Sequence, residues 1–196
     1  MRVPSKNECF ELICRMDMMD HIVAHSLRVC QVALVLADGL AKDGARLDRE
    51  LIRAGALLHD ITKTRSFATR ENHAESGGLW IDELGYPAVG SIVRQHVKLD
   101  DYPQEALFSE AEIVNYADKR VLHDQVVSLE RRMHYIVERY CRKEADKRRI
   151  DWLLEKTREL EARIFGCLAF DPEELGSRMS AGAYRRELQS YHASCN

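Results

Sequence analysis

The sequence is poor in residues that break regular structure, with only 10 glycines and 4 prolines among 196 residues. Its apolar residues recur mostly at the helical spacing, and strict alternation is rare. No internal repeat or low-complexity tract is visible. These features predict an all-α fold, and a hydrophobic content of 45% over this length is enough for one sizeable core.

Signals for export, membrane insertion and nucleic-acid binding are also missing. The first twenty residues lack the uninterrupted apolar run of a secretory signal, and no window approaches the length of a membrane span. The formal charge of −3 provides no excess of positive charge for nucleic acid or for a membrane surface. We therefore expect a cytoplasmic protein that binds neither.

Motifs for thiol chemistry and for phosphate-binding loops are absent as well. The six cysteines are scattered and form no CxxC pair, so we expect reduced, mostly structural thiols and no zinc–thiolate site. There is no Walker-type glycine loop and no coherent Ser-His-Asp or Cys-His arrangement. Covalent catalysis and NTP-driven chemistry are therefore disfavoured.

Helices are expected along most of the chain. Capping-box patterns at Ser5–Glu8 and Ser109–Glu112 each precede a helix. A polar loop is expected over 61–72, and from 126 onward we expect amphipathic helices with solvated charged faces, one of them ending near Gly166. The run "RKEADKRR" is accordingly expected at the surface. The periodicity and the caps predict helices over 6–16, 21–40, 48–58, 73–84, 87–97 and 111–122.

A His-Asp pair follows the apolar run in "AGALLHDITK". A lone histidine on an apolar face is usually a hydrogen-bonded core residue, and a lone aspartate can be a surface charge. Burying many such groups is costly unless a cation satisfies them, and a divalent metal does so. Here one predicted helix after another places such a residue beside an apolar run: His25, His59, Asp60, His73, His96 and Asp118.

The order of these residues resembles the H…HD…D pattern of the HD-domain metal-dependent phosphohydrolases. "HDITK" is similar to their "HDIGK" motif, with Thr62 in place of the common glycine. "NHAESGG" and "IVRQH" stand where the two-metal subset, which includes HD-type diadenosine tetraphosphate hydrolases, carries two further histidines. The resemblance covers roughly residues 20 to 125. The "GYP" at 85–87 is a turn and not the signature of the HD-GYP family.

The resemblance implies an all-α HD-domain bundle with additional C-terminal helices. We divide the chain into a metal-binding helical domain over 1–125 and charged helices over 126–196 that pack on it or extend from it. Two divalent transition metals are implied, and iron, manganese, zinc or nickel would suit such mixed ligands. Asp60 would bridge the two ions. The first ion would be held by His25, His59, Asp60 and Asp118, and the second position would be completed by His73 and His96.

Basic residues near these ligands are candidates for substrate contact. Lys63 lies one helical turn past Asp60 and could neutralise charge on a phosphoryl oxygen, or it could be a solvent lysine. Arg28 lies one turn beyond His25 and could reach the substrate or form a surface salt bridge. Three weaker candidates are Lys119, Arg120 and His123. His21 lies on the same helix face as His25 and is expected to support that residue or to play no part in the site.

We predict a phosphohydrolase that cleaves a phosphoester or phosphoanhydride bond of a small, nucleotide-like substrate through a metal-activated water. Asp60 and Lys63 are its expected catalytic residues, and Arg28 and Lys63 its expected substrate contacts. Three alternatives are open: a one-metal nucleotidase in which His73 and His96 bind phosphate, a di-iron oxygenase, and a non-catalytic module that senses a metal or a nucleotide. Specificity should lie in segments 61–72 and 98–108 and in the C-terminal helices. A homodimer is compatible with the sequence.

Overall fold

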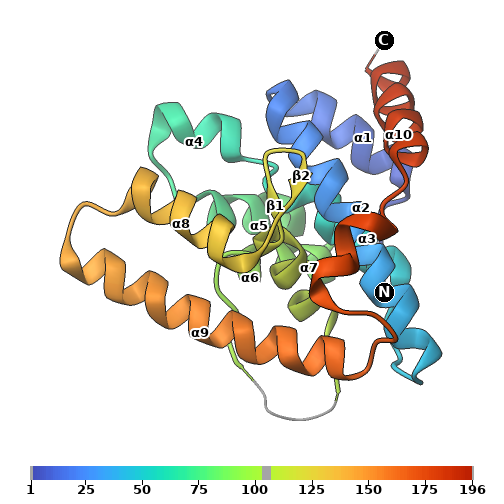
Figure 1. Cartoon of the computed structure of the whole chain (residues 1–196). Coiled ribbons are helices and arrows are strands. Elements are labelled where there is room, and N and C mark those ends of the chain that lie inside the picture. The colour runs from blue at the N-terminus through green and yellow to red at the C-terminus, as the bar shows by residue number, and fades with distance from the viewer. Residues whose placement is uncertain (1, 103–106, 196) are drawn as a thin grey trace.

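The structure, a computed structural model, describes residues 2–102 and 107–195 and is dominated by helices (Figure 1). The predicted all-α class is confirmed. One short antiparallel pair, β1 (Val121–Leu122) and β2 (Gln125–Val126), interrupts the helices of the described residues. The helices are α1 (Lys6–Arg15), α2 (Asp20–Lys42), α3 (Arg49–Leu58), α4 (Lys63–Thr69), α5 (His73–Glu83), α6 (Pro87–Gln95), α7 (Glu110–Lys119), α8 (Leu129–Tyr140), α9 (Glu144–Gly166) and α10 (Ala181–Ser194), with a 3-10 helix η1 (Pro172–Arg178).

The core forms around α2, which packs against α3 and α7. Apolar residues such as Val29, Val32 and Leu36 are fully buried along this helix. Contrary to the expectation from the sequence, α2 is long and apolar enough to cross a membrane, by length and composition alone. A central core helix needs the same length and apolar composition, and 61% of the most apolar window of α2 is buried inside the protein.

Close packing of α5 on α6 determines where two of the histidines lie. A Cβ atom on Gly78 would lie 2.8 Å from the carbonyl oxygen of Gly90, so neither position tolerates a larger side chain without displacement of the backbone. The two helices are joined by a tight turn at Gly85, whose φ of +86° favours glycine. They therefore run antiparallel, and the start of α5 lies beside the end of α6.

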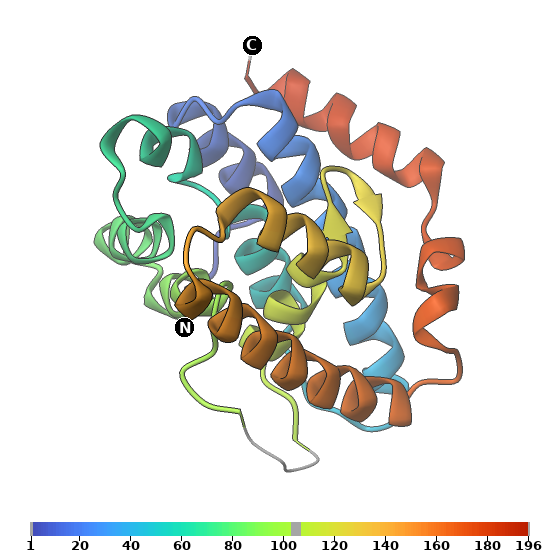
Figure 2. The ribbon, with the colours of Figure 1, turned by 60° about the vertical axis from the view of Figure 1, so that its left-hand side comes forward.

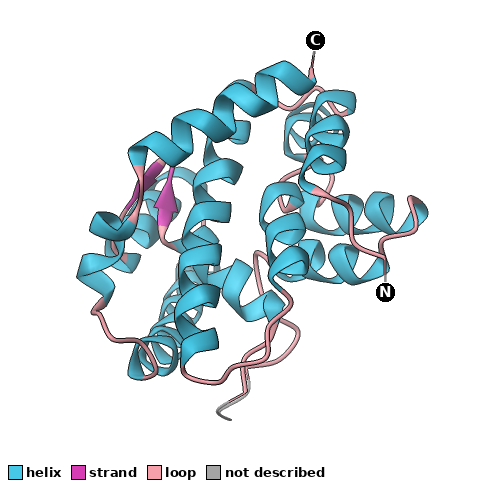
Figure 3. Ribbon diagram, turned by 90° about the vertical axis from the view of Figure 1, so that its right-hand side faces the viewer, coloured by secondary structure: helices cyan, strands magenta, loops and turns pink. Residues whose placement is uncertain are grey.

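Two local predictions are wrong. The segment 61–72 is not a loop throughout, because α4 occupies Lys63–Thr69. The helix expected to reach residue 122 ends at Lys119, and the chain then forms the short β1–β2 hairpin (Figure 3). His123 lies in the turn of this hairpin with a φ of +55°, the left-handed conformation in which histidine is tolerated better than branched residues.

The C-terminal third covers two sides of the bundle. Helices α8 and α9 pack against each other and against α7, and they lie in front of the bundle in Figure 2. Helix α10 packs on α1 and α2, where a disulfide joins Cys14 to Cys195 with a Cα–Cα distance of 5.5 Å. The expectation that all six cysteines are reduced is therefore wrong for this pair, which the sequence could not reveal because its members are 181 residues apart.

Candidate metal centre

Two of the six candidate ligands end helices in the same way. His59 is the C-cap of α3 and His96 the C-cap of α6. The Nδ1 of His59 donates to the carbonyl of Ala56 at 2.8 Å, and the Nδ1 of His96 donates to that of Val93 at 2.6 Å. The last carbonyls of a helix lack partners within it, so this contact satisfies the helix end and also directs Nε2 away from it.

His25 has the same arrangement with a partner that is distant in sequence. Its Nδ1 lies 2.9 Å from the carbonyl oxygen of His123, in the turn of the β1–β2 hairpin. Because a carbonyl can only accept, Nδ1 bears a hydrogen, and Nε2 is directed toward Oδ1 of Asp118 at 3.0 Å. His123 thus positions a ligand through its backbone, a role that its side-chain identity does not reveal.

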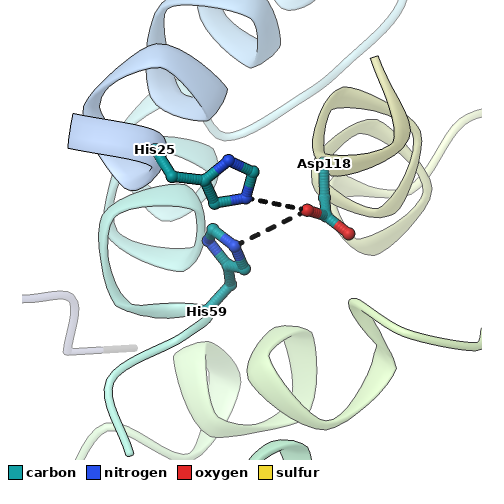
Figure 4. Close-up of side chains that lie close together, drawn as sticks. All are labelled: His25, His59 and Asp118. Carbon is teal, nitrogen blue, oxygen red and sulfur yellow. Dashed lines mark hydrogen bonds and ion pairs between the residues drawn. The ribbon is translucent and has the colours of Figure 1, made fainter. Parts of the chain in front are cut away.

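The first cluster of ligand atoms is formed by His25, His59 and Asp118, as Figure 4 shows. The Nε2 of His25 lies 3.0 Å from Oδ1 of Asp118, and the Nε2 of His59 lies 3.8 Å from the same oxygen. The Nε2 of His59 is buried and has no hydrogen-bond partner among the residues that the structure describes. The cluster therefore places two imidazole nitrogens beside one carboxylate oxygen, and one of these nitrogens, Nε2 of His59, is left without a donor or acceptor among the described residues.

The second cluster is formed by Asp60, His73 and His96. The Oδ1 of Asp60 lies 3.1 Å from Nε2 of His73 and 3.5 Å from Nε2 of His96. Its other oxygen, Oδ2, lies 3.6 Å from Nε2 of His59 in the first cluster. The two oxygens of Asp60 thus face different clusters, the geometry expected of a carboxylate between two cations.

Protonation states agree with this arrangement. Burial lowers the pKa of His59 to about 4 and also lowers the pKa of His73, so these rings are neutral near pH 7. Burial alone would raise the pKa of Asp60, but the ammonium of Lys63 and the neighbouring imidazoles hold it well below its usual range. The pKa of Asp118 is likewise held low, against its burial, by His25 and Arg132.

The residues present fit divalent metal ions. Neutral imidazoles and ionised carboxylates are the donors that zinc, iron, manganese and nickel accept, and the buried Nε2 of His59, which has no hydrogen-bond partner in the described part of the chain, could bind such an ion. All six candidate ligands lie together, in two groups of three whose ligand atoms are within 4.8 Å of one another. Asp60, which the resemblance places between the two ions, lies with His73 and His96 and also faces His59.

Residues around the clusters hold the ligands in place. The hydroxyl of Thr62, which stands where the resembling motif has glycine, donates to the carbonyl of His73 at 2.8 Å. From α7, Lys119 donates to the carbonyl of His96 at 3.0 Å and to both oxygens of Asn115. Burial lowers the pKa of Lys119 to about 8. Lys119 therefore fixes the end of α6, and Thr62 fixes the start of α5.

The basic residues proposed for substrate contact divide into two groups. The Nζ of Lys63 lies 3.4 Å from Oδ1 of Asp60 and 3.1 Å from Nε2 of His73, inside the centre. Arg28 instead donates to the carbonyl of Asp124, stacks over Tyr184 and does not line the cavity at the centre. The placement of Arg28 therefore argues against substrate contact.

Arg120 is also occupied elsewhere. It donates to the carbonyls of Val127 and Pro172 and pairs with Glu161, so it joins α7 to the segments that follow. His21 is exposed on the first turn of α2.

A cavity of about 480 Å³ opens onto the two clusters. Its floor contains Asp60, His73, His96 and Asp118, and part of its wall comes from α8 and α9. These wall residues were not identified from the sequence, although the run "RKEADKRR" is mostly exposed, as expected. Periodicity could have indicated them, since they recur at helical steps on one face: Arg132, Ile136 and Tyr140 of α8, and Asp146, Arg149, Ile150 and Leu153 of α9.

Comparison with known families agrees with this geometry. The family profile described as "HD domain" matches residues 22–121, half of the chain. The chain belongs to the HD domain family. The matched segment runs from the start of α2 to β1 and contains all six candidate ligands. The superfamily resemblance inferred from the sequence is therefore confirmed, and α8, α9 and α10 lie outside the matched segment.

Two curated relatives are similar to this chain. The tRNA (cytidine(56)-2'-O)-methyltransferase of Picrophilus torridus is 27% identical over 146 residues, which are 67% of this chain and 40% of that protein. An uncharacterized protein of Methanocaldococcus jannaschii is 32% identical over 89 residues, 45% of this chain and 52% of that protein. The chain thus spans about half or less of these relatives. No solved structure matches it significantly.

Proposed function

We propose that this HD-domain protein is a metal-dependent phosphohydrolase that cleaves a phosphoester or phosphoanhydride bond of a small, nucleotide-like substrate. The observation that supports this most is the placement of Asp60, whose two carboxylate oxygens face two separate clusters of histidines at the floor of one cavity. A bridging carboxylate between two divalent ions is the arrangement that hydrolytic two-metal sites use.

Each group of residues has a distinct role in this proposal. His25, His59 and Asp118, together with Asp60, would hold the first ion, and His73 and His96 would complete the second position. Divalent ions bound there would activate a water and hold the phosphate oxygens for in-line attack.

Lys63 is placed beside Asp60, where its ammonium can neutralise charge that develops on a phosphoryl oxygen.

One observation favours a one-metal version of the same activity. The ammonium of Lys63 lies within 3.4 Å of both Asp60 and His73, so it already supplies a positive charge to the second cluster. In that version His73 and His96 bind phosphate directly. The two versions differ in metal content per chain, which elemental analysis measures.

The proposal extends to partners and location. We propose a small phosphorylated substrate as the partner and neither nucleic acid nor a membrane. A homodimer and a cytoplasmic location remain predictions from the sequence. The disulfide between Cys14 and Cys195 argues against the cytoplasmic location, because disulfides are rare in most reducing compartments.

The test combines metal analysis with a substrate screen. Protein purified anaerobically is analysed for iron, manganese, zinc and nickel, and phosphate release is then measured over phosphomonoesters, nucleotides and dinucleotides. Phosphate release that requires bound metal and disappears in Asp60→Asn supports the proposal. Metal-loaded protein that binds nucleotides but hydrolyses none would instead identify a sensing module, and consumption of oxygen with an organic substrate would identify an oxygenase.

A further inference from the structure

The hairpin of α8 and α9 forms a wall of the cavity although it lies outside the matched HD segment. Arg132, Ile136 and Tyr140 are spaced by four residues, so they share the face of α8 that borders the cavity. The bordering residues of α9 begin with Asp146 and Arg149 in its first turns. The wall therefore changes character along its length, from a cation beside the metal ligands to apolar and aromatic groups farther along α8.

Arg132 has spare hydrogen-bonding capacity next to the metal centre. Its Nη2 lies 3.4 Å from Oδ1 of Asp118, a long contact, and its side chain is only 16% exposed. Its buried Nε has no hydrogen-bond partner within residues 2–102 and 107–195. A guanidinium offers five donors in a fixed plane and binds phosphate through two of them at once. Leaving such donors unpaired is costly, so an anion at this position would stabilise the site.

The aromatic groups of the cavity are unusually exposed. Phe67 of α4 is 55% exposed and Tyr140 of α8 is 54% exposed, and both line the cavity. Ile136, Ile150 and Leu153 add apolar surface to the lining of the same cavity. Ligand sites of this kind combine apolar and aromatic walls with a few polar anchors. A planar ring is the ligand group that exposed aromatic side chains bind best.

We propose that the α8–α9 hairpin is the substrate-recognition element of this protein, with Arg132 binding the phosphoryl group and Tyr140, together with Phe67, binding a planar aromatic ring attached to it. The substrate class is then a phosphorylated aromatic molecule such as a nucleoside monophosphate. The placement of the phosphoryl group rests on the proposed function. The formal charge of the cavity agrees with an anion, since Lys63, Lys119, Arg132 and Arg149 outnumber its three aspartates before any metal is bound.

Separate probes for the two halves of the ligand test this assignment without turnover. Inorganic phosphate and adenosine are the products expected from adenosine monophosphate, and neither is consumed. Their binding to the metal-loaded full chain is measured by calorimetric titration or by competition. Arg132→Gln should weaken phosphate at least about tenfold and leave adenosine unchanged, because it removes a charged hydrogen bond. Tyr140→Ala and Phe67→Ala should weaken adenosine about fivefold or more and leave phosphate unchanged.

Control variants separate direct effects on ligand binding from indirect effects on the fold or on metal content. Trp152→Ala removes another partly exposed aromatic residue of α9 that lies outside the cavity lining, and it should alter neither affinity. Tyr140→Phe keeps the ring and should retain adenosine binding. Metal content is measured in every variant, because Arg132 could act only by supporting Asp118. Loss of metal in Arg132→Gln with unchanged phosphate affinity in the loaded fraction would overturn its assignment as a phosphate ligand.

The two proposals fail in different ways. If adenosine binds no more weakly to Tyr140→Ala and Phe67→Ala than to the wild type, the recognition element is wrong, whatever the turnover. If the probes behave as expected but no phosphorylated compound is hydrolysed, the recognition element stands and the phosphohydrolase proposal fails.

Discussion

Removing His73 and His96 together should abolish one metal position and leave the other. Of the three ligand groups in the second cluster, the double variant His73→Ala/His96→Ala retains only Asp60, whose Oδ1 then has Lys63 within 3.4 Å as its cationic partner. The first cluster keeps both of its histidines and Asp118. Metal content should therefore fall from near two ions per chain to near one, with most of the activity lost.

The stabilisation of the folded state by bound metal is a second quantity that this experiment can measure. A bound ion present at a hundredfold excess over its dissociation constant stabilises the folded state by about 2.7 kcal/mol per site. The metal-induced gain in the free energy of unfolding should thus be about halved in the double variant. The metal-free variant should be weakened by about 1 kcal/mol for the lost contact between His96 and Val93, with a further cost for the vacated volume.

Elemental analysis and thermal unfolding with and without metal are the assays. The control is His21→Ala/His134→Ala, which removes two exposed histidines away from the centre and should keep the full metal content. Unchanged metal content in His73→Ala/His96→Ala would refute the two-ion reasoning and favour the one-metal version. Loss of all metal would show that the two clusters do not bind independently.

Three further predictions concern single perturbations. Asp60→Asn should abolish phosphate release while the far-ultraviolet circular dichroism stays helical, and wild-type turnover in this variant would exclude the proposed role of Asp60. The metal-free protein should lose stability as the pH falls from about 6.5 to about 4. Over that range an unfolded His59 binds a proton that the folded ring, with its pKa of about 4, does not. The loss should reach about 3 kcal/mol in denaturant titrations, and a flat profile there would contradict the burial argument. Serine at both Cys14 and Cys195 should lower the melting temperature by opening a link across 181 residues, at a cost of up to about 5 kcal/mol. Metal content should not change, since neither sulfur touches the centre, and an unaltered melting temperature would show that the link is not stabilising.

The sequence by itself determined the helical class and the chemistry of the centre. Apolar periodicity predicted the helices around Val29 and Leu57, and the two capping boxes predicted the starts of α1 and α7, because both signals are local properties of the chain. The His59-Asp60 pair and the order of the other ligands indicated a metal site, since burying so many ionisable groups together is costly without a cation.

Only the tertiary structure decided how these residues are grouped and what surrounds them. The division of Asp60 between two clusters depends on the packing of α3, α5 and α6, which no local pattern encodes. The support that His25 receives from residue 123 comes through a backbone carbonyl, which every residue type possesses. Arg132 lies 14 residues from Asp118, and they meet because the chain reverses through a short hairpin before α8. Charged helices that look solvated in the sequence can form a cavity wall, because which face is exposed depends on what a helix packs against.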